Sequence, residues 1–131
     1  MVRITRQVPT ILSDWASAIS PNNTSEMVRF YCVNAVLVGT YSQPLEVGLK
    51  QISKYFDWFL DKKSISCKII DNVNQELDCC TISSGVYEFM VDGKKVVARY
   101  SYVFKNVNNR MRIVNHHSSE LVEIWKQDKL I

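Results

Sequence analysis

Both histidines of the chain lie side by side, and two serines follow them directly as His116, His117, Ser118 and Ser119. The residues before them, from Met111 onward, are largely apolar or β-branched and predict a strand. Neighbouring residues of a strand point to opposite faces, so His116 shares a face with Ser118 and His117 shares one with Ser119. One histidine–serine pair must therefore face the interior of the sheet, where an imidazole can act as a general base.

Simple alternation along this strand favours burial of the second pair. It groups Met111 and Ile113 with His117 and Ser119, and apolar residues on one face indicate that the face is buried.

The pairing of the last two predicted strands favours the first pair. A four-residue loop over residues 106–109 would place Arg99 directly across from His116, and directly opposed residues share a face within about 5.5 Å. A slip of one residue would exchange the two faces. We expect His116 and Ser118 to face inward, together with Arg99.

Composition limits the classes of protein that the chain can represent. Its 131 residues predict a single domain over residues 1–131. The hydrophobic fraction of 47% and the charged fraction of 22% are ordinary for a soluble protein. A net charge of +3 without a basic run argues against nucleic acid as a partner. The first six residues lack the apolar core of a signal peptide, and no apolar run is long enough to cross a membrane. We therefore expect a cytoplasmic protein with no membrane partner, unless a leader segment was removed.

Cysteine and histidine content argue against a metal centre. Cys32, Cys67, Cys79 and Cys80 form no C-x-x-C pair, and we expect reduced thiols that mostly fill the core. On a strand, Cys79 and Cys80 would point apart. Two histidines cannot supply a three-histidine zinc site. We therefore expect no cofactor, while zinc or manganese held partly by water and a carboxylate stays open as an alternative.

Helical periodicity dominates the first half of the chain. It predicts a helix over residues 7–20, a short second helix capped by Asn23, a strand over residues 35–38 that ends at Gly39, and a long helix over residues 44–60.

From Ser64 onward the pattern has a period of two. We predict a strand around residues 65–69, then strands over residues 81–91, 94–105 and 111–119, with a tight turn at Asp92–Gly93. The tail over residues 120–125 fits either a strand or a helix. The order of elements predicts an α+β fold: a cone-shaped, curved antiparallel sheet with the N-terminal helices packed on its concave face and a pocket inside.

Five segments, in this order, resemble a known family. They are residues 31–42 (YCVNAVLVGTYS), 52–60 (ISKYFDWFL), 84–87 (SGVY), 98–102 (ARYSY) and 113–119 (IVNHHSS). Together they resemble the calcium/calmodulin-dependent kinase II association-domain family, which has the nuclear transport factor two-like, cystatin-like cone fold. Within that family they are similar to the bacterial and algal branch of iota-class carbonic anhydrases.

The resemblance implies site residues and an activity. It implies that Thr40, Tyr55, His116 and Ser118 surround a small polar pocket that hydrates carbon dioxide to bicarbonate. Some members of the branch use a metal and others work without one. We expect the metal-free reaction, with neutral His116, at a reference pKa of about 6.5, taking the proton as water attacks.

Related kinase hub domains carry cavity arginines, which implies a role for the guanidinium of Arg99. We expect it to hold the anion that forms. Ser101, His117 and Ser119 complete the expected substrate- and anion-binding residues. A mid-strand arginine would be costly to bury without such a partner.

Two alternatives to an enzyme remain at this point. One is an assembly module that forms a homodimer or a larger ring. Aromatic residues that could cover such a surface are Tyr87, Phe89, Tyr100, Tyr102 and Trp125. The other is a binding protein in which Arg99 captures a small carboxylate without turnover.

Overall fold

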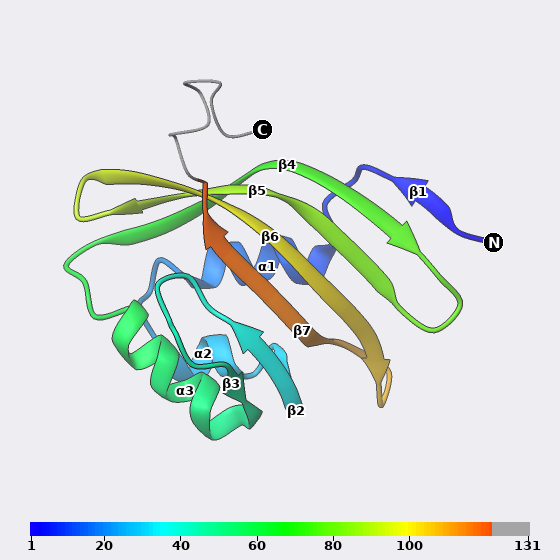
Figure 1. Ribbon diagram of the computed structural model, residues 1–131, viewed down its shortest axis with the longest axis horizontal. Coiled ribbons are helices and arrows are strands. Elements are labelled where there is room, and N and C mark those ends of the chain that lie inside the picture. The colour runs from blue at the N-terminus through cyan, green and yellow to red at the C-terminus, as the bar shows by residue number, and fades with distance from the viewer. Residues whose placement is uncertain (122–131) are drawn as a thin grey trace.

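The computed structural model describes residues 1–121, which form one curved sheet with helices along its concave side (Figure 1). The strand order is β1-β4-β5-β6-β7-β2-β3. All neighbours are antiparallel except β2 and β7, which run parallel. The tail beyond residue 121 lies outside the described residues. The strands are β1 (Arg3–Thr5), β2 (Tyr31–Val38), β3 (Glu46–Val47), β4 (Ile65–Glu76), β5 (Thr81–Val91), β6 (Lys94–Val107) and β7 (Arg110–Glu120).

The helices are α1 (Thr10–Ala18), α2 (Thr24–Val28) and α3 (Gly48–Phe59). Asn23 caps α2 as predicted, because its side chain accepts a hydrogen bond from the Ser25 amide at 3.0 Å. The predicted start of α3 at Pro44 was wrong. Residues of β3 pair with β2 instead, and Gly48 turns the chain into the helix at φ +83°.

The concave face of the sheet is packed with aromatic side chains. Alternate residues of β5, β6 and β7 are buried there against the apolar stripes of α1 and α3, and α1 passes behind β6 and β7 in Figure 1. Burying one large apolar side chain stabilises the fold by about 1.5–3 kcal/mol. The fold predicted from the order of elements is confirmed. Inward residues of the sheet are Tyr87, Phe89, Ala98, Tyr100, Tyr102, Phe104 and Ile113.

The two tight hairpin turns use residues that tolerate a left-handed backbone. Asp92 and Gly93 have φ of +49° and +85°, which confirms the predicted turn between β5 and β6. The turn between β6 and β7 consists of Asn108 and Asn109, at φ +54° and +64°. This turn is two residues shorter than predicted, so the pairing of the strands moves by two positions without exchanging their faces.

Strand β7 then contains one residue more than the segment of β6 that it faces. Ile113 pairs with Phe104, whereas Asn115 pairs with Val103, which leaves Val114 without a partner in β6. This is a β-bulge. Because it adds one residue, the inward positions of β7 change from odd to even numbers after it.

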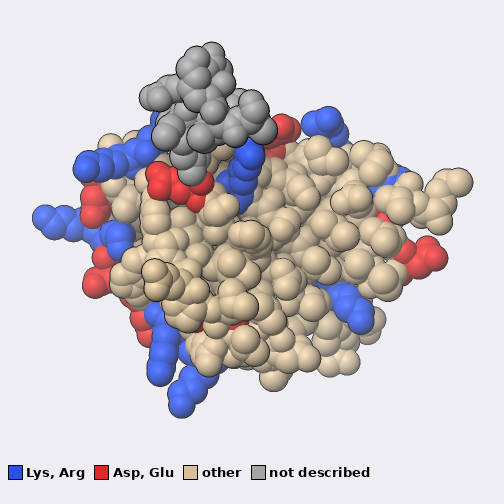
Figure 2. Space-filling model, viewed as in Figure 1, with Lys and Arg blue, Asp and Glu red and all other residues tan. Residues whose placement is uncertain are grey.

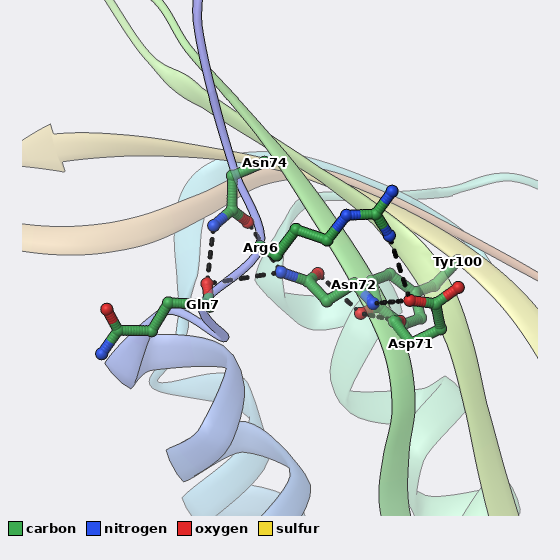
Figure 3. Close-up of polar contacts among 6 residues, drawn as sticks. All are labelled: Arg6, Gln7, Asp71, Asn72, Asn74 and Tyr100. Carbon is green, nitrogen blue, oxygen red and sulfur yellow. Dashed lines mark hydrogen bonds and ion pairs between the residues drawn. The ribbon is translucent and has the colours of Figure 1, made fainter.

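A ladder of buried amides holds the start of α1 against the sheet (Figure 3). Asn74 donates a hydrogen bond to the Gln7 carbonyl at 2.6 Å, and Asn72 donates to Asn74 Oδ1 at 2.8 Å. The Tyr100 hydroxyl donates to Asn72 Oδ1 at 2.7 Å. Both asparagines are buried, so each partner removes the cost of an unsatisfied polar group. The ladder fixes where α1 begins and therefore where Trp15 enters the core.

Candidate functional site

His116 lies inside a cage of aromatic rings. Its side chain is only 2% exposed. The Tyr102 ring stacks on the imidazole at 3.9 Å between centroids and 14° between planes. Trp15 from α1 contacts it edge-on at 5.4 Å. Residues far apart in the sequence thus exclude water from this imidazole.

Each ring nitrogen of His116 meets a tyrosine hydroxyl. The Tyr31 hydroxyl lies 2.9 Å from Nδ1, and the Tyr87 hydroxyl lies 3.2 Å from Nε2. The indole nitrogen of Trp15 donates to the Tyr31 hydroxyl at 3.2 Å. The imidazole is therefore fully satisfied without a solvent molecule.

The chain of polar groups continues from Tyr87 to the edge of the sheet. The Tyr87 hydroxyl donates a hydrogen bond to Ser118 Oγ, and Ser118 Oγ lies 2.5 Å from Thr40 Oγ1. The Tyr55 hydroxyl, from α3, donates to the Thr40 carbonyl at 3.0 Å. Thr40, Tyr55, His116 and Ser118, which the sequence placed together, are in fact neighbours.

These contacts determine one direction of donation from His116 through Tyr87 to Ser118. Tyr87 has a single proton and donates it to Ser118, so Nε2 of His116 must carry the proton that it donates to Tyr87. Nδ1 is then the acceptor, and Tyr31 donates to it. Either hydroxyl can donate in the contact between Ser118 and Thr40. With Ser118 as the donor, the proton of the Thr40 hydroxyl is available to a further group.

Burial keeps the titratable side chains of this hydrogen-bonded series neutral. Burial and, to a smaller extent, the neighbouring charge of His117 together lower the pKa of His116 from 6.5 to about 3. Burial also raises the pKa of Tyr31 and Tyr87 well above the ordinary value for a phenol. The pKa of His116 in the fold therefore lies well below the reference value of about 6.5 from which its role as a base was expected.

Local backbone features position Thr40. A Cβ on Gly39 would lie 2.4 Å from the Tyr55 ring, so only glycine lets this ring pack against the end of β2. Tyr41 then turns the chain at φ +65°, and its hydroxyl donates to Glu120 Oε1 at 2.6 Å. The loop is thereby held beside the end of β7, where Ser118 lies.

The bulge in β7 resolves the conflict between the two sequence patterns. Alternation correctly buries Ile113, but the extra residue Val114 exchanges the faces of the strand after it, so His116 and Ser118 are buried in place of His117 and Ser119. The expected inward pair is therefore correct, whereas the pairing with Arg99 from which it was inferred is not.

The remaining predicted residues lie on the outer face of the sheet. Arg99 pairs with Ser119 and Ser101 pairs with His117, and Arg99, His117 and Ser119 are exposed. The prediction that Arg99 faces His116 was wrong, since the bulge exchanges the faces. An exposed guanidinium needs no buried partner, which removes the reason for expecting an anion there.

Sequence reasoning missed the tyrosines of β5 and β6 that surround His116. Tyr87 and Tyr102 were expected on an assembly surface together with Phe89 and Tyr100, but all four are buried on the concave face. Their alternation in β5 and β6 was the available signal, because it places them on one face of each strand. Trp125 lies outside the described residues.

Two cavities flank the chain of polar groups. One, of about 790 Å³, opens beside the irregular part of β2 and has Tyr31 in its wall. The other, of about 330 Å³, has Tyr41, Tyr55 and Trp58 in its wall. Neither wall includes His116 or Ser118, so aromatic rings fill the space where the sequence predicted an open pocket.

The donor set around His116 does not fit a metal ion. Within residues 1–121 no group of three or more histidine, cysteine, aspartate or glutamate side chains is close enough to hold one. Both nitrogens of His116 are already engaged by tyrosines.

Within residues 1–121, no helix is both long and apolar enough to span a membrane.

The curved sheet with helices on its concave face defines a protein of the NTF2-like, cystatin-like class. It is similar to an NTF2-like protein of unknown function from Pseudomonas putida KT2440, at 8% identity and a TM-score of 0.77 over 92% of this chain and 89% of that one. A cystatin-like protein from Caulobacter vibrioides matches at 9% identity and a TM-score of 0.77, over 91% and 90% of the two chains. These likenesses concern the fold alone.

The family follows from sequence as well as fold. Residues 5–121 match the calcium/calmodulin dependent protein kinase II association domain, and the chain belongs to this family. A protein from Xanthomonas campestris assigned to the same domain is 32% identical, with a TM-score of 0.78 over 85% of this chain and 83% of that one. No curated protein matches the chain significantly.

Proposed function

We propose that this protein hydrates carbon dioxide to bicarbonate without a metal, at the end of the buried chain formed by Ser118 and Thr40. The observation that carries the proposal is the convergence of Thr40, Tyr55, His116 and Ser118 in one hydrogen-bonded cluster. These are the residues to which the iota-class resemblance points.

The low pKa of His116 determines which mechanism is possible. An imidazole with a pKa of about 3 cannot retain a proton near neutral pH, so it is not the base that takes a proton from water. A buried, neutral cluster instead favours a step that creates no full charge, since a charge in this environment would be heavily penalised.

The Thr40 hydroxyl can pass a proton within such a step. The oxygen of water forms a bond to the carbon of carbon dioxide, and a proton of that water moves to Thr40 Oγ1. The hydroxyl proton of Thr40 moves at the same time to an oxygen of carbon dioxide. The product is carbonic acid, which ionises to bicarbonate in solvent, and Thr40 is regenerated.

The rest of the cluster holds this hydroxyl in place. In this mechanism Ser118 donates to Thr40 Oγ1, which is one of the two directions open to their contact, and thereby directs the proton of Thr40 away from Ser118. Tyr87 and His116 are positioning residues, because they hold Ser118 in the donating orientation. Tyr55 fixes the Thr40 backbone through its carbonyl and forms part of the wall of the smaller cavity, which we propose as the access route.

Stopped-flow measurement of carbon dioxide hydration tests the proposal. Thr40→Val should lower the rate by about 10²–10⁴-fold, the usual contribution of a proton-transfer group. Ser118→Ala should also lower the rate, because it removes the group that orients the Thr40 hydroxyl. The matched change Ser119→Ala, on the outer face, should leave it within about twofold. A chelator should have no effect. A rate no faster than buffer for the unmodified protein would refute the proposal, and loss of activity with chelator would point to a metal enzyme.

The dependence of the rate on pH separates this mechanism from the one expected from the sequence. No group in the cluster titrates between pH 5 and 9 on the shifts described above, so kcat should be flat over that range. A rise in kcat centred near pH 6.5 would show that His116 acts as a free base after all.

A second candidate function is an assembly module without turnover. The outer face of β5 and β6 carries half-buried Ile82, Val86, Val97 and Val103. Figure 2 shows few charged side chains across the middle of this face and more around its rim. A surface of this kind is typical of contact with another chain. Light scattering would detect a homodimer or ring, and Val103→Glu should dissociate it; a monomer at all concentrations would exclude this function.

Capture of a small carboxylate by Arg99 has less support. The side chain is exposed on the outer face and lines neither of the two cavities beside the cluster. A guanidinium without a surrounding pocket binds a single carboxylate weakly in water.

A further inference from the structure

The turn between β4 and β5 brings two thiols together. It consists of residues 77–80, and the Leu77 amide donates a hydrogen bond to the Cys80 carbonyl at 2.9 Å. Cys79 is exposed and Cys80 is partly exposed. Their sulfur atoms lie 3.6 Å apart. The prediction that these side chains point apart was wrong, because both residues belong to the turn and not to a strand.

The geometry of adjacent cysteines disfavours a disulfide. Consecutive Cα atoms are about 3.8 Å apart across a trans peptide. No peptide bond among residues 1–121 is cis. The Cα atoms of ordinary disulfides are about 4.4–6.8 Å apart, and the sulfurs must approach to about 2.05 Å. Direct oxidation of this pair would therefore strain the turn.

Bridging by a larger atom fits the observed spacing. A tetrahedral metal with metal–sulfur bonds of about 2.3 Å holds its two sulfurs about 3.8 Å apart. The thiols of Cys79 and Cys80 are 3.6 Å apart and so lie close to this separation before anything binds. Chelation then requires little rearrangement, which is the condition for tight binding.

We propose that Cys79 and Cys80 form a two-thiolate chelating site for thiophilic species, namely soft metal ions and trivalent arsenicals. Thiolates select soft ions over harder ones such as magnesium. The remaining coordination positions belong to water or to an external ligand, since no third cysteine, histidine or carboxylate completes a cluster within residues 1–121.

The reaction with phenylarsine oxide illustrates the chemistry. Two sulfur–arsenic bonds form, the arsenic–oxygen bond breaks, and the oxygen leaves as water with the two thiol protons. Arsenic stays trivalent, so no oxidant or reductant is needed. The site lies at the β4–β5 turn, at the opposite end of the sheet from α3 and β3 (Figure 1), and its test is independent of the proposed hydration activity.

Phenylarsine oxide binding in the presence of excess glutathione tests the site, because a competing monothiol removes adducts on single cysteines more readily than chelates. Intact mass measurement of the full chain should show one bound arsenical. Cys79→Ser and Cys80→Ser should each lower the affinity at least 100-fold. The matched change Cys67→Ser, near the start of β4, should leave it unchanged.

Several outcomes would overturn the proposal. One is that Cys79→Ser or Cys80→Ser binds the arsenical as tightly as the unmodified protein does. Another is that the unmodified protein loses the arsenical in the presence of excess glutathione. A mass lower by two hydrogens without arsenic would show a strained disulfide instead. Cadmium ion alone gives an independent readout: its thiolate charge-transfer absorption should appear in the unmodified chain and be absent from Cys79→Ser. Its persistence in that variant would also contradict chelation by this pair.

Discussion

The two faces of β7 carry the same residue types in opposite circumstances. His116 and Ser118 are buried and joined to three other hydroxyl groups, whereas His117 and Ser119 are exposed on the outer face. The pKa of His116 is lowered to about 3 by burial. One position along a strand therefore decides whether a histidine is a neutral structural relay or a surface group.

The difference also shows how little local sequence separates the two faces. A regular ladder after Ile113 would place His117 and Ser119 inside, and the extra residue Val114 reverses this. The aromatic cage around the inner face then fixes the outcome, since Tyr31 and Tyr87 satisfy both imidazole nitrogens.

Acid should expose the difference between the two histidines most strongly. The pKa of His116 is about 3 in the folded protein and 6.5 in the unfolded chain, so between these values the unfolded chain binds more protons. The free energy of unfolding should therefore fall as pH drops from 6.5 toward 3, by on the order of 4 kcal/mol from this residue.

Urea unfolding at pH 7 and pH 4 measures this effect. His116→Gln should remove most of the extra acid sensitivity, because it removes the group that titrates. His117→Gln should retain it. Equal acid sensitivity in the unmodified protein and in His116→Gln would contradict the burial of a neutral imidazole.

Truncating each histidine at neutral pH should give the next largest difference. His116→Ala leaves a cavity and removes the hydrogen-bond partner of the Tyr31 and Tyr87 hydroxyls. We therefore expect the free energy of unfolding to fall by about 3 kcal/mol. His117→Ala removes only an exposed side chain and should change it by less than about 0.5 kcal/mol. Chemical denaturation measures both, and equal losses would mean that the two faces do not differ.

Removing one hydroxyl should test the direction of donation. Tyr87→Phe leaves Nε2–H of His116 and the Ser118 oxygen without their partner, at a cost of about 1–3 kcal/mol. Nitrogen NMR of the unmodified protein should show the His116 proton on Nε2, and in Tyr87→Phe this preference should weaken.

Tyr41→Phe is the matched control for that change. It removes an exposed hydroxyl that binds Glu120 and should leave the His116 tautomer unaltered. A proton on Nδ1 in the unmodified protein would contradict the derived direction.

The smallest effect is expected on the outer face itself. Arg99→Ala should change the free energy of unfolding by less than about 0.5 kcal/mol, because the side chain is exposed. It should also leave the rate of carbon dioxide hydration within about twofold. A large loss of hydration would return Arg99 to the site and show that the outer face takes part in the reaction.

The sequence by itself determined the order of the helices and of the longer strands, though not the short strands β1 and β3, and the chemistry available to them. Helical and two-residue periods placed α1, α3 and the long strands, and turn residues placed the hairpin at Asp92–Gly93, because these features depend on neighbours in the chain. The family was also visible in short segments, of which the histidine–serine run is the clearest.

Only the tertiary structure decided which histidine is inside and what surrounds it. The β6–β7 register depends on a two-residue turn and on the bulge at Val114, and neither leaves a reliable local signal. The cage joins His116 to Trp15, Tyr31 and Tyr87. The low pKa of His116 arises because residues distant in the sequence exclude water from its imidazole. The alternation of residues along one strand carries no information about these distant neighbours.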